Sequence, residues 1–377
     1  MGLIRTLPLP VRLPLIHAAL ATAWRLREPR WRGLPANRQT GPLVVSGFLG
    51  EALGVGRAAD ATANALEAAG YAVERQSLRP AQTAIWAPGQ KPRLTDRPGG
   101  VWLIHANAPE AEVALMAHDA ADWMSRYRIG YWAWETTLAP LAWARTARWL
   151  DEIWVTSHFT AGAIRNTLER AGMGDQARKL RVMPHPVTRP ASVQADPIRF
   201  GLEPGIKHAL VMFDGRSAFA RKNPWGAIEA WTRAFPEPPA DARLVLKVRA
   251  LNADPAARRR LAALMAERPD LQLIETDLSA AEVWNLLASV DLLISLHRAE
   301  GFGLIPAEAM ALGKPGVMTG WSGVTDFADN DSAALIPFHL VAVDDPSGAY
   351  RTGQWAEPDL DIAAARIREL ITDPEKA

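Results

Sequence analysis

From Pro42 onward, short apolar runs alternate with longer stretches in which apolar and polar residues follow helical spacing. This alternation is typical of βα units, in which parallel strands are joined by helices. A Gly-rich loop follows the first run and precedes a predicted helix at 57–69, and Ser157 or Thr160 is placed to cap a later helix. The predicted strands of this half are residues 43–46, 101–104, 129–134 and 153–156.

Five prolines between Met183 and Pro204 interrupt the pattern, and a second βα series begins after them. We expect the boundary between two domains in this stretch. The expected fold class is therefore α/β, with two Rossmann-like domains that each contain a mostly parallel sheet. The second series has predicted strands at 208–213, 243–248, 271–275, 291–296 and 316–318, and a closing helix at 359–372.

The composition limits the possible functions. At 377 residues the chain is longer than one hydrophobic core usually supports, which agrees with two domains. The absence of cysteine excludes disulfides, thiol nucleophiles and thiolate metal sites. Lys and Arg number 42 against 41 Asp and Glu, so the overall charge does not indicate nucleic-acid binding. No apolar run reaches the ~18 residues of a membrane span, and the start lacks a signal-peptide pattern, so we expect a cytoplasmic protein.

The first 40 residues differ from the rest, because they hold seven arginines and only one glutamate. Leucines and two tryptophans, Trp24 and Trp31, are interspersed among these arginines. Apolar and basic side chains together are typical of segments that attach to an anionic membrane surface. We therefore predict peripheral attachment to the inner face of the cell membrane. The alternatives are an arm packed on the protein's own domains and a partly disordered leader.

The stretch 294–313 contains the most specific chemistry. A strand is expected to end near Leu296 and a helix to begin at Pro306, with a glycine-containing loop between them. Open α/β sheets bind ligands at the carboxyl ends of strands, and free N–H groups at a helix start face anions such as a diphosphate. Glu300 and Glu308 flank these groups, so Glu308 is positioned to hold ribose hydroxyls and Glu300 to reach a sugar. The N–H groups belong to Gly301, Phe302, Gly303 and Leu304.

A second set of charged residues follows the predicted strand at 208–213. Arg216 and Lys222 lie in one loop, before a helix that Asn223 would cap and Pro224 would begin. Two fixed cations beside a helix N-terminus neutralise the charge that develops on a departing pyrophosphate. Taken alone, the two side chains are equally compatible with a solvated loop.

In order and spacing, four residues resemble the signature of the retaining GT-B glycosyltransferases of family 4: Arg216, Lys222, Glu300 and Glu308. That signature combines an Arg and Lys pair with a Glu-x7-Glu motif. The resemblance covers about residues 42–377 and is most specific in the second half. It implies two facing Rossmann-like domains, and transfer of a sugar from a UDP- or GDP-sugar with unchanged anomeric configuration. By resemblance, the Arg and Lys hold the donor diphosphate, Glu308 holds the ribose, and Glu300 lies beside the donor sugar.

The charge pattern, the proline-rich boundary and the resemblance together predict a division of the chain. A basic segment at 1–40 precedes an N-terminal acceptor domain at 41–190. A C-terminal domain at 191–355 binds the nucleotide-sugar, and a final helix within 356–377 packs back on the N-terminal domain. The implied acceptor is a saccharide or a polyprenyl-linked molecule in bacterial surface-polysaccharide synthesis.

In the first half, Gly54 and Gly56 resemble the glycine-rich loop that such enzymes place against the donor. They also fit the G-x-G-x-x-A fingerprint of NAD-binding domains, with Glu74 20 residues further on. However, Gly54 comes seven residues after the strand end, whereas the dinucleotide turn follows its strand directly. His105 resembles a cleft histidine that contacts the donor sugar, and Glu135 is placed to face the acceptor. A structural role is open for both.

Two Asp-x-Asp pairs, at 329–331 and 359–361, match the divalent-metal motif of other glycosyltransferases. Neither follows an apolar strand in a nucleotide-binding half, so we interpret them as turn residues and expect no metal or other cofactor. Three alternatives to a glycosyltransferase stay open. They are an NAD-dependent Rossmann enzyme, a sugar-nucleotide epimerase of the GT-B fold, and a non-catalytic sugar- or nucleotide-binding module.

Overall fold

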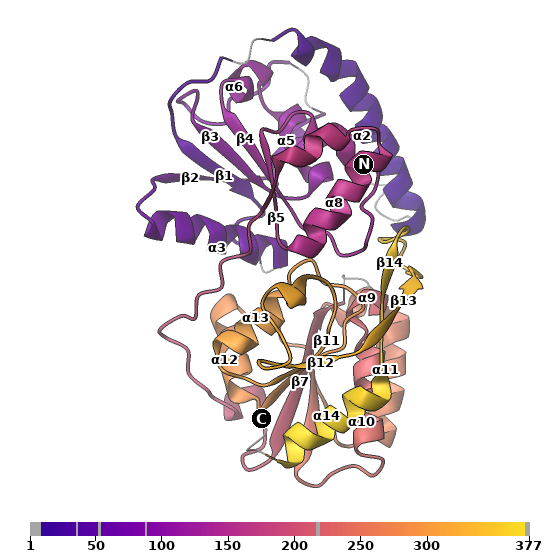
Figure 1. Cartoon of the computed structure of the whole chain (residues 1–377). Helices are drawn as coiled ribbons and strands as arrows, with labels where there is room; N and C mark the ends of the chain where they lie inside the picture. Colours follow the sequence, from indigo (N-terminus) through magenta and orange to yellow (C-terminus); the bar gives the residue numbers. More distant parts are fainter. Residues whose placement is uncertain (1–8, 35–36, 52–53, 87–88, 216–218, 374–377) are drawn as a thin grey trace. The chain divides into compact units, whose positions relative to one another are not determined.

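The described part of the chain forms two compact units, each built on a six-stranded sheet. The first unit extends to Pro186 and also includes Ser347–Thr352, and the second begins at Val187 and takes the remaining residues. Helices cover both faces of each sheet, which confirms the predicted α/β class with two Rossmann-like domains. Figure 1 shows the computed structural model, which describes residues 9–34, 37–51, 54–86, 89–215 and 219–373.

The sheet of the first unit is parallel throughout, in the order β2-β1-β3-β4-β5-β6. Its strands are β1 (Leu43–Gly47), β2 (Val73–Ser77), β3 (Val101–His105), β4 (Tyr127–Trp132), β5 (Glu152–Val155) and β6 (Leu180–Val182). Its helices are α2 (Leu9–Arg32), α3 (Gly54–Ala68), α4 (Ala81–Ala84), α5 (Ala108–Ala117), α6 (Ala120–Met124), α7 (Trp143–Ala147), α8 (His158–Arg170) and the 3-10 helix η1 (Gly174–Lys179).

Alternating side chains of the central strands form the two cores of this unit. Val44 and Trp102 pack with residues of α2, α5, α7 and α8, whereas Val45 and Leu103 pack with Ala63 of α3. Because helices cover both faces, neighbouring residues of β1 and β3 are buried alike. Double burial explains why these strands form continuous apolar runs in the sequence.

The sheet of the second unit is also parallel, in the order β12-β11-β10-β7-β8-β9. Its strands are β7 (Lys207–Asp214), β8 (Ala242–Arg249), β9 (Leu271–Ile274), β10 (Leu292–Ser295), β11 (Gly316–Thr319) and β12 (Ala334–Ile336). One core contains α10 (Pro224–Ala234), α11 (Pro255–Glu267) and α14 (Leu360–Thr372); the other contains α12 (Ala280–Ser289) and α13 (Leu304–Ala311). The remaining elements are α9 (Phe219–Lys222), the 3-10 helices η2 (Ile198–Phe200), η3 (Leu251–Ala253) and η4 (Ser322–Asp326), and the antiparallel hairpin β13 (Phe338–Ala342) and β14 (Gln354–Pro358).

The closing helix α14 belongs to the second unit, so the prediction that it packs back on the N-terminal domain is wrong. Its apolar side chains face the core of the second unit beside α10, because they lie at helical spacing on one stripe. The connection between β13 and β14 is instead the segment that joins the first unit, where the ring of Tyr350 lies 5.2 Å from that of Trp134. The buried residues of α14 are Ala363, Ala364, Ile367 and Ile371.

Helix α2 packs on the first unit through its second half. Trp24 and Trp31 are buried there, and Trp31 lies edge-on to Trp123 and Trp149, with ring centroids 5.3 and 5.6 Å away. The prediction that these two tryptophans enter a membrane surface is therefore wrong, since they fill the protein's own core. Among the helices that the structure describes, none is long and apolar enough to cross a bilayer.

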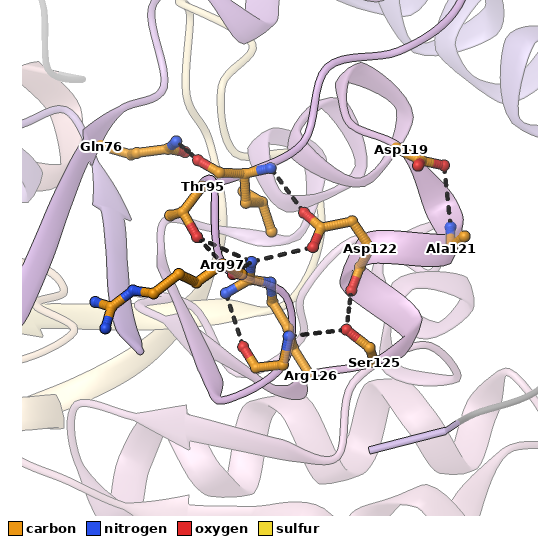
Figure 2. A network of polar contacts seen from close by, with 10 residues as sticks. Gln76, Thr95, Arg97, Asp119, Ala121, Asp122, Ser125 and Arg126 are labelled. Carbon is orange, nitrogen blue, oxygen red and sulfur yellow. Dashed lines mark hydrogen bonds and ion pairs between the residues drawn. The ribbon is translucent and has the colours of Figure 1, made fainter. Parts of the chain in front are cut away.

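A buried arginine forms hydrogen bonds with the segment that leads into β3 (Figure 2). The guanidinium of Arg126 donates to the carbonyls of Arg97 and Gly99 at 2.7 and 2.8 Å, and to the carboxylate of Asp122 at 3.0 Å. The second carboxylate oxygen of Asp122 accepts the backbone N–H of Leu94 at 2.7 Å. A planar guanidinium can hold several acceptors in fixed directions, so this network fixes the amino end of β3.

Candidate functional site

The strand order of the second unit reverses between β7 and β10, because β8 and β9 extend the sheet on one side of β7 and β10 lies on the other. Such a reversal in an open parallel sheet leaves a crevice at the carboxyl ends of the two strands, where ligands bind. Helix α10 begins at Pro224 and α13 at Leu304, shortly after these strand ends. A cavity of about 20 Å³ lies here, and its walls include Lys222, Glu300 and Pro306.

Glu300 is held by two cations at this crevice. Lys222 Nζ contacts its Oε1 atom, and Arg221 Nη1 lies 3.1 Å from its Oε2 atom. The side chains of Glu300 and Arg221 are 10% and 8% exposed, and that of Lys222 is 22% exposed. Burial raises the pKa of Glu300, but the charges of Lys222 and Arg221 outweigh burial and hold this pKa at about 2. The carboxylate is therefore ionised at neutral pH.

The loop after Glu300 has a backbone that only glycine fits. Gly303 has a φ of +97°, and a Cβ atom at this position would lie 2.7 Å from Cγ1 of Val324. The neighbouring Phe302 is buried and packs on Phe327, with ring centroids 5.2 Å apart. Gly301 and Phe302 lie between Glu300 and α13, which begins at Leu304 and not at the predicted Pro306.

Two residues with left-handed backbone conformation support the same loop. Ser322 has a φ of +69°, and its Oγ atom accepts the backbone N–H of Glu300 at 2.9 Å. Asn223 has a φ of +49°, donates to the carbonyl of Leu296 at 2.9 Å and accepts the N–H of Gly226 at 3.2 Å. The predicted cap at Asn223 is thus confirmed. Left-handed non-glycine residues cost on the order of 1–3 kcal/mol and persist where the surroundings hold them.

Two predicted donor-binding residues remain. Glu308 lies in the second turn of α13 and is buried, with an exposed fraction of 5%. Its predicted contact with a ribose stays a prediction. Arg216 lies outside the described residues, so the predicted pairing of two cations on one loop is described only for Lys222.

The first unit has a corresponding strand reversal between β1 and β3, and His105 is the last residue of β3. His105 is 3% exposed, and in the described part of the chain its Nε2 atom has no hydrogen-bond partner. Burial lowers the pKa of His105 to about 4, so the imidazole is neutral at pH 7. Its ring lies 4.2 Å from Tyr131 and 5.5 Å from His185. A neutral imidazole at this edge is chemically suited to a hydrogen bond with a ligand hydroxyl.

The other predicted residues of the first unit are less constrained. Gly54 and Gly56 lie in the first turn of α3, so the predicted glycine-rich loop is in fact a helix start. A Cβ atom on Gly56 would lie 2.5 Å from the carbonyl oxygen of Glu51, whereas one on Gly54 would meet nothing within 4 Å. Only Gly56 is therefore required by packing. Glu135 follows β4 by three residues and is half-buried.

The two Asp-x-Asp pairs have structural roles. Asp329 accepts the backbone N–H groups of Asp331 and Ser332 at 3.1 and 3.0 Å, which makes the first pair a turn, as predicted. Asp359 instead caps α14 and accepts the N–H of Asp361. The second pair is therefore a helix start and not a turn.

Comparison with known proteins decides the family. A family model described as Family 4 Glycosyltransferase in conflict systems matches residues 165–377, which is more than half of the chain. The chain belongs to this family. The matched residues include Lys222, Glu300 and Glu308, on which the sequence resemblance was based. The enzyme class of the chain is therefore glycosyltransferase, while no curated protein matches it in sequence.

Solved structures show that this family 4 glycosyltransferase has the GT-B fold. HepE from Anabaena, solved with UDP and glucose, matches with a TM-score of 0.59 and 14% identity over 89% of this chain and 91% of HepE. A glycosyltransferase from Rickettsia africae gives a TM-score of 0.59 and 14% identity over 89% of each chain. The pneumococcal O-GlcNAc transferase GtfA, solved with UDP and GlcNAc, gives a TM-score of 0.50 and 14% identity over 73% of this chain. The chain spans about half the length of GtfA and of S. aureus TarM.

Sequence reasoning does not find the contacts of two arginines close to Glu300 in the structure. Arg221 contacts Glu300. In the sequence it stands beside Lys222 and looks like a second solvated cation. The structure places both residues in the short helix α9. Arg298 joins α9 to β14, because it donates to the carbonyl of Ala220 at 2.8 Å and pairs with Glu357 at 2.6 Å. The acidic partner lies 59 residues away in the sequence, so no local pattern shows this contact.

Proposed function

We propose that this family 4 glycosyltransferase moves a sugar from a UDP- or GDP-sugar to a saccharide or polyprenyl-linked acceptor, with retention of the anomeric configuration. The observation that supports this most is the cluster of Lys222, Arg221 and Glu300 at the reversal between β7 and β10. The cluster combines cations for a diphosphate with an ionised carboxylate for a sugar, at the edge where open α/β sheets bind nucleotides.

Each residue has a distinct role in this proposal. Lys222, together with Arg216, neutralises the diphosphate as the bond to the sugar breaks. Glu308 accepts hydrogen bonds from the ribose, and Glu300 faces the donor sugar. The backbone N–H groups at the start of α13, from Gly301 to Leu304, supply further donors to the phosphate oxygens.

The proposed reaction exchanges one bond at the anomeric carbon for another. The bond between this carbon and the donor phosphate oxygen breaks, and a bond to the acceptor hydroxyl oxygen forms on the same face of the sugar. The acceptor proton passes to the departing phosphate, and the nucleoside diphosphate leaves. No side chain has to act as the base, and we propose that no divalent metal is required.

Residues of the first unit complete the proposal. His105 hydrogen-bonds a hydroxyl of the donor sugar, Gly54 and Gly56 let α3 start close to the donor, and Glu135 faces the acceptor. The support for His105 is its buried, neutral imidazole at the strand reversal of the first unit. We propose surface-polysaccharide synthesis as the setting that a saccharide or lipid-linked acceptor implies.

Attachment to an anionic membrane surface stays part of the proposal, with a smaller contact area than the sequence predicts. Trp24 and Trp31 are buried, but Val11, Leu15 and Leu26 of α2 are 50%, 48% and 71% exposed. Exposed apolar side chains beside exposed arginines suit the interface of an anionic bilayer. Co-sedimentation with anionic vesicles that disappears in high salt and in a Leu26→Glu variant is the expected result.

Donor binding tests the proposed function directly. Isothermal titration calorimetry with UDP, GDP and their sugar conjugates, in the presence of EDTA, should give binding to the wild-type protein. Glu308→Ala should weaken it roughly tenfold, because a buried hydrogen bond to a ribose is worth about 1.5 kcal/mol or more when one partner is charged. Glu275→Gln, which removes a surface carboxylate paired with Arg258, is the matched control and should bind normally. Equal binding by Glu308→Ala and the control would contradict the assignment of Glu308.

A further inference from the structure

We propose that Arg221 is a positioning residue that keeps Glu300 in place when Lys222 leaves it to bind the donor diphosphate. The proposal rests on the proposed function, because it concerns the same site and the same donor. Its basis is that the two cations contact different oxygens of one carboxylate, Lys222 at Oε1 and Arg221 at Oε2. One cation can therefore depart while the other stays.

The contacts indicate which cation departs. Lys222 lines the cavity at the strand ends together with Glu300, and its side chain is more exposed than that of Arg221. Arg221 Nη1 has a second acceptor, the carbonyl of Ala299 at 2.9 Å, which anchors the guanidinium beside the loop. An ammonium on a flexible four-carbon stem changes partners more readily than a guanidinium held by two acceptors.

Neighbouring residues fix the backbone of Glu300, so only its side chain depends on the two cations. Its backbone N–H donates to Ser322 Oγ at 2.9 Å, and its carbonyl accepts the N–H of Gly323 at 2.9 Å. Gly323 has no room for a side chain, because a Cβ atom there would overlap the backbone of Gly301. The cavity beside the ion pair holds about one water molecule, so a bulkier group at this wall needs the lining side chains to move, Lys222 among them.

This arrangement has two opposite energetic consequences. Glu300 competes with the diphosphate for Lys222, so its charge weakens nucleotide binding. Without Arg221, the departure of Lys222 would leave a buried carboxylate with no ion-pair partner among the residues that the structure describes, and an uncompensated buried charge is strongly unfavourable. Arg221 therefore makes the exchange of partners possible, and its effect on nucleotide binding depends on the charge of Glu300.

A double-mutant cycle measures this dependence. Calorimetric titrations with UDP are made on the wild-type protein, Arg221→Met, Glu300→Gln and the double variant, with uridine as the probe that lacks a diphosphate. If the wild type binds GDP and not UDP, GDP and guanosine are used. Thermal unfolding shows that each variant is folded, and Arg258→Met, which removes a surface arginine paired with Glu275, is the matched control.

The expected result has three parts. Glu300→Gln should bind UDP about fivefold more tightly than the wild type, because Lys222 no longer has a competing carboxylate. Arg221→Met should bind UDP on the order of tenfold more weakly, and Arg221→Lys should recover part of the loss. In the Glu300→Gln background, Arg221→Met should change the affinity less than about twofold, since the buried carboxylate that Arg221 compensates is gone. Binding of the nucleoside should not change.

Two outcomes overturn the proposal. If Arg221→Met weakens UDP binding equally in the wild-type and Glu300→Gln backgrounds, Arg221 is a direct ligand of the nucleotide or a purely structural residue. If Glu300→Gln and the wild type bind UDP with the same affinity, Glu300 does not compete for Lys222. This outcome is measured without any Arg221 variant, so it does not depend on the folding of those variants. Failure of the wild type to bind either UDP or GDP would instead reject the proposed function, and the inference with it.

Discussion

Gly303 sets the backbone of the loop that leads from Glu300 into α13. Its φ of +97° and the closeness of Val324 leave no space for a Cβ atom. Gly313, at the other end of the same helix, also has a positive φ of +69°, but a Cβ atom there would meet nothing within 4 Å. Alanine substitutions at the two glycines therefore separate the free-energy cost of backbone strain from the cost of steric overlap.

We expect Gly303→Ala to destabilise the protein by about 3 kcal/mol and Gly313→Ala by about 1 kcal/mol, because only the first combines strain with overlap. Thermal unfolding should show the Gly303→Ala transition roughly 5 °C below that of Gly313→Ala. Nucleotide affinity should fall only in Gly303→Ala. Similar unfolding temperatures and affinities for the two variants would show that the loop adapts to a side chain at 303.

His105 makes the stability of the first unit dependent on pH. Burial lowers its pKa from 6.5 to about 4, so below pH 6.5 the unfolded chain binds a proton that the folded chain does not. Stability should therefore fall as the pH decreases from 6.5 towards 4, by roughly 2 kcal/mol at pH 5. A His105→Gln variant should show a smaller loss, and the lowered pKa of His185, which is due first to burial and then to His105, should keep only the contribution of burial in that variant. Parallel unfolding free energies of the two proteins between pH 7 and 5 would contradict the neutral state of His105.

At the level of single residues, the sequence predicts which charged side chains lie after the strand ends of the second unit. Lys222 and Glu300 stand beside helix starts that follow apolar strands, and this local pattern is sufficient to place these two residues near one another. Arg221 is missed because its partner lies 79 residues away and its neighbour is another cation. The ion pair between Lys222 and Glu300 is missed for a related reason, since the sequence predicts a ligand contact for each residue and no contact between the two.

At the scale of elements, the Arg126 network determines how the chain enters β3. Asp122, on α6, and the carbonyls of the segment before β3 all depend on one fully buried guanidinium (Figure 2). We expect Arg126→Met to destabilise the first unit by about 3–5 kcal/mol, because it leaves a buried carboxylate without its cation. Arg97→Met is the matched control in the same segment, since its side chain is 72% exposed and pairs with Glu74 at the surface.

Urea unfolding followed by tryptophan fluorescence measures this difference, because the core of the first unit contains many tryptophans. The control should lose less than about 1 kcal/mol, as exposed ion pairs contribute little. If Arg126→Met unfolds at the same urea concentration as Arg97→Met, the network is not a main support of the unit.

The elements that the sequence predicts best are those buried on both faces. Strands β1, β3, β7 and β8 each contain consecutive apolar residues, and the structure has them within one or two residues of the predicted ends. Strand β2 is missed because it is an edge strand with polar residues at 74–77. Helix α2 is missed because Pro14 and Pro29 and the many arginines obscure its helical spacing, although Trp24 and Trp31 fall on its buried face.

At the scale of the whole molecule, the two units share one construction. Each has a parallel sheet whose strand order reverses next to its first strand, and each carries its candidate chemistry at that reversal, His105 in one unit and Glu300 in the other. The closing helix could not be assigned from the sequence, because its apolar stripe is compatible with either sheet. Its position in the second unit is decided by tertiary packing.

Release of a nucleoside diphosphate from sugar nucleotides is the most direct test of the account. Wild-type protein, incubated with a panel of UDP- and GDP-sugars, saccharide acceptors and EDTA, should release UDP or GDP from at least one donor. Lys222→Met should lower kcat/KM for that donor on the order of 100-fold, because the cation stabilises the leaving diphosphate. Undiminished release by Lys222→Met, or no release from any donor by the wild-type protein, would contradict the central claim that this site transfers a sugar from a nucleoside diphosphate.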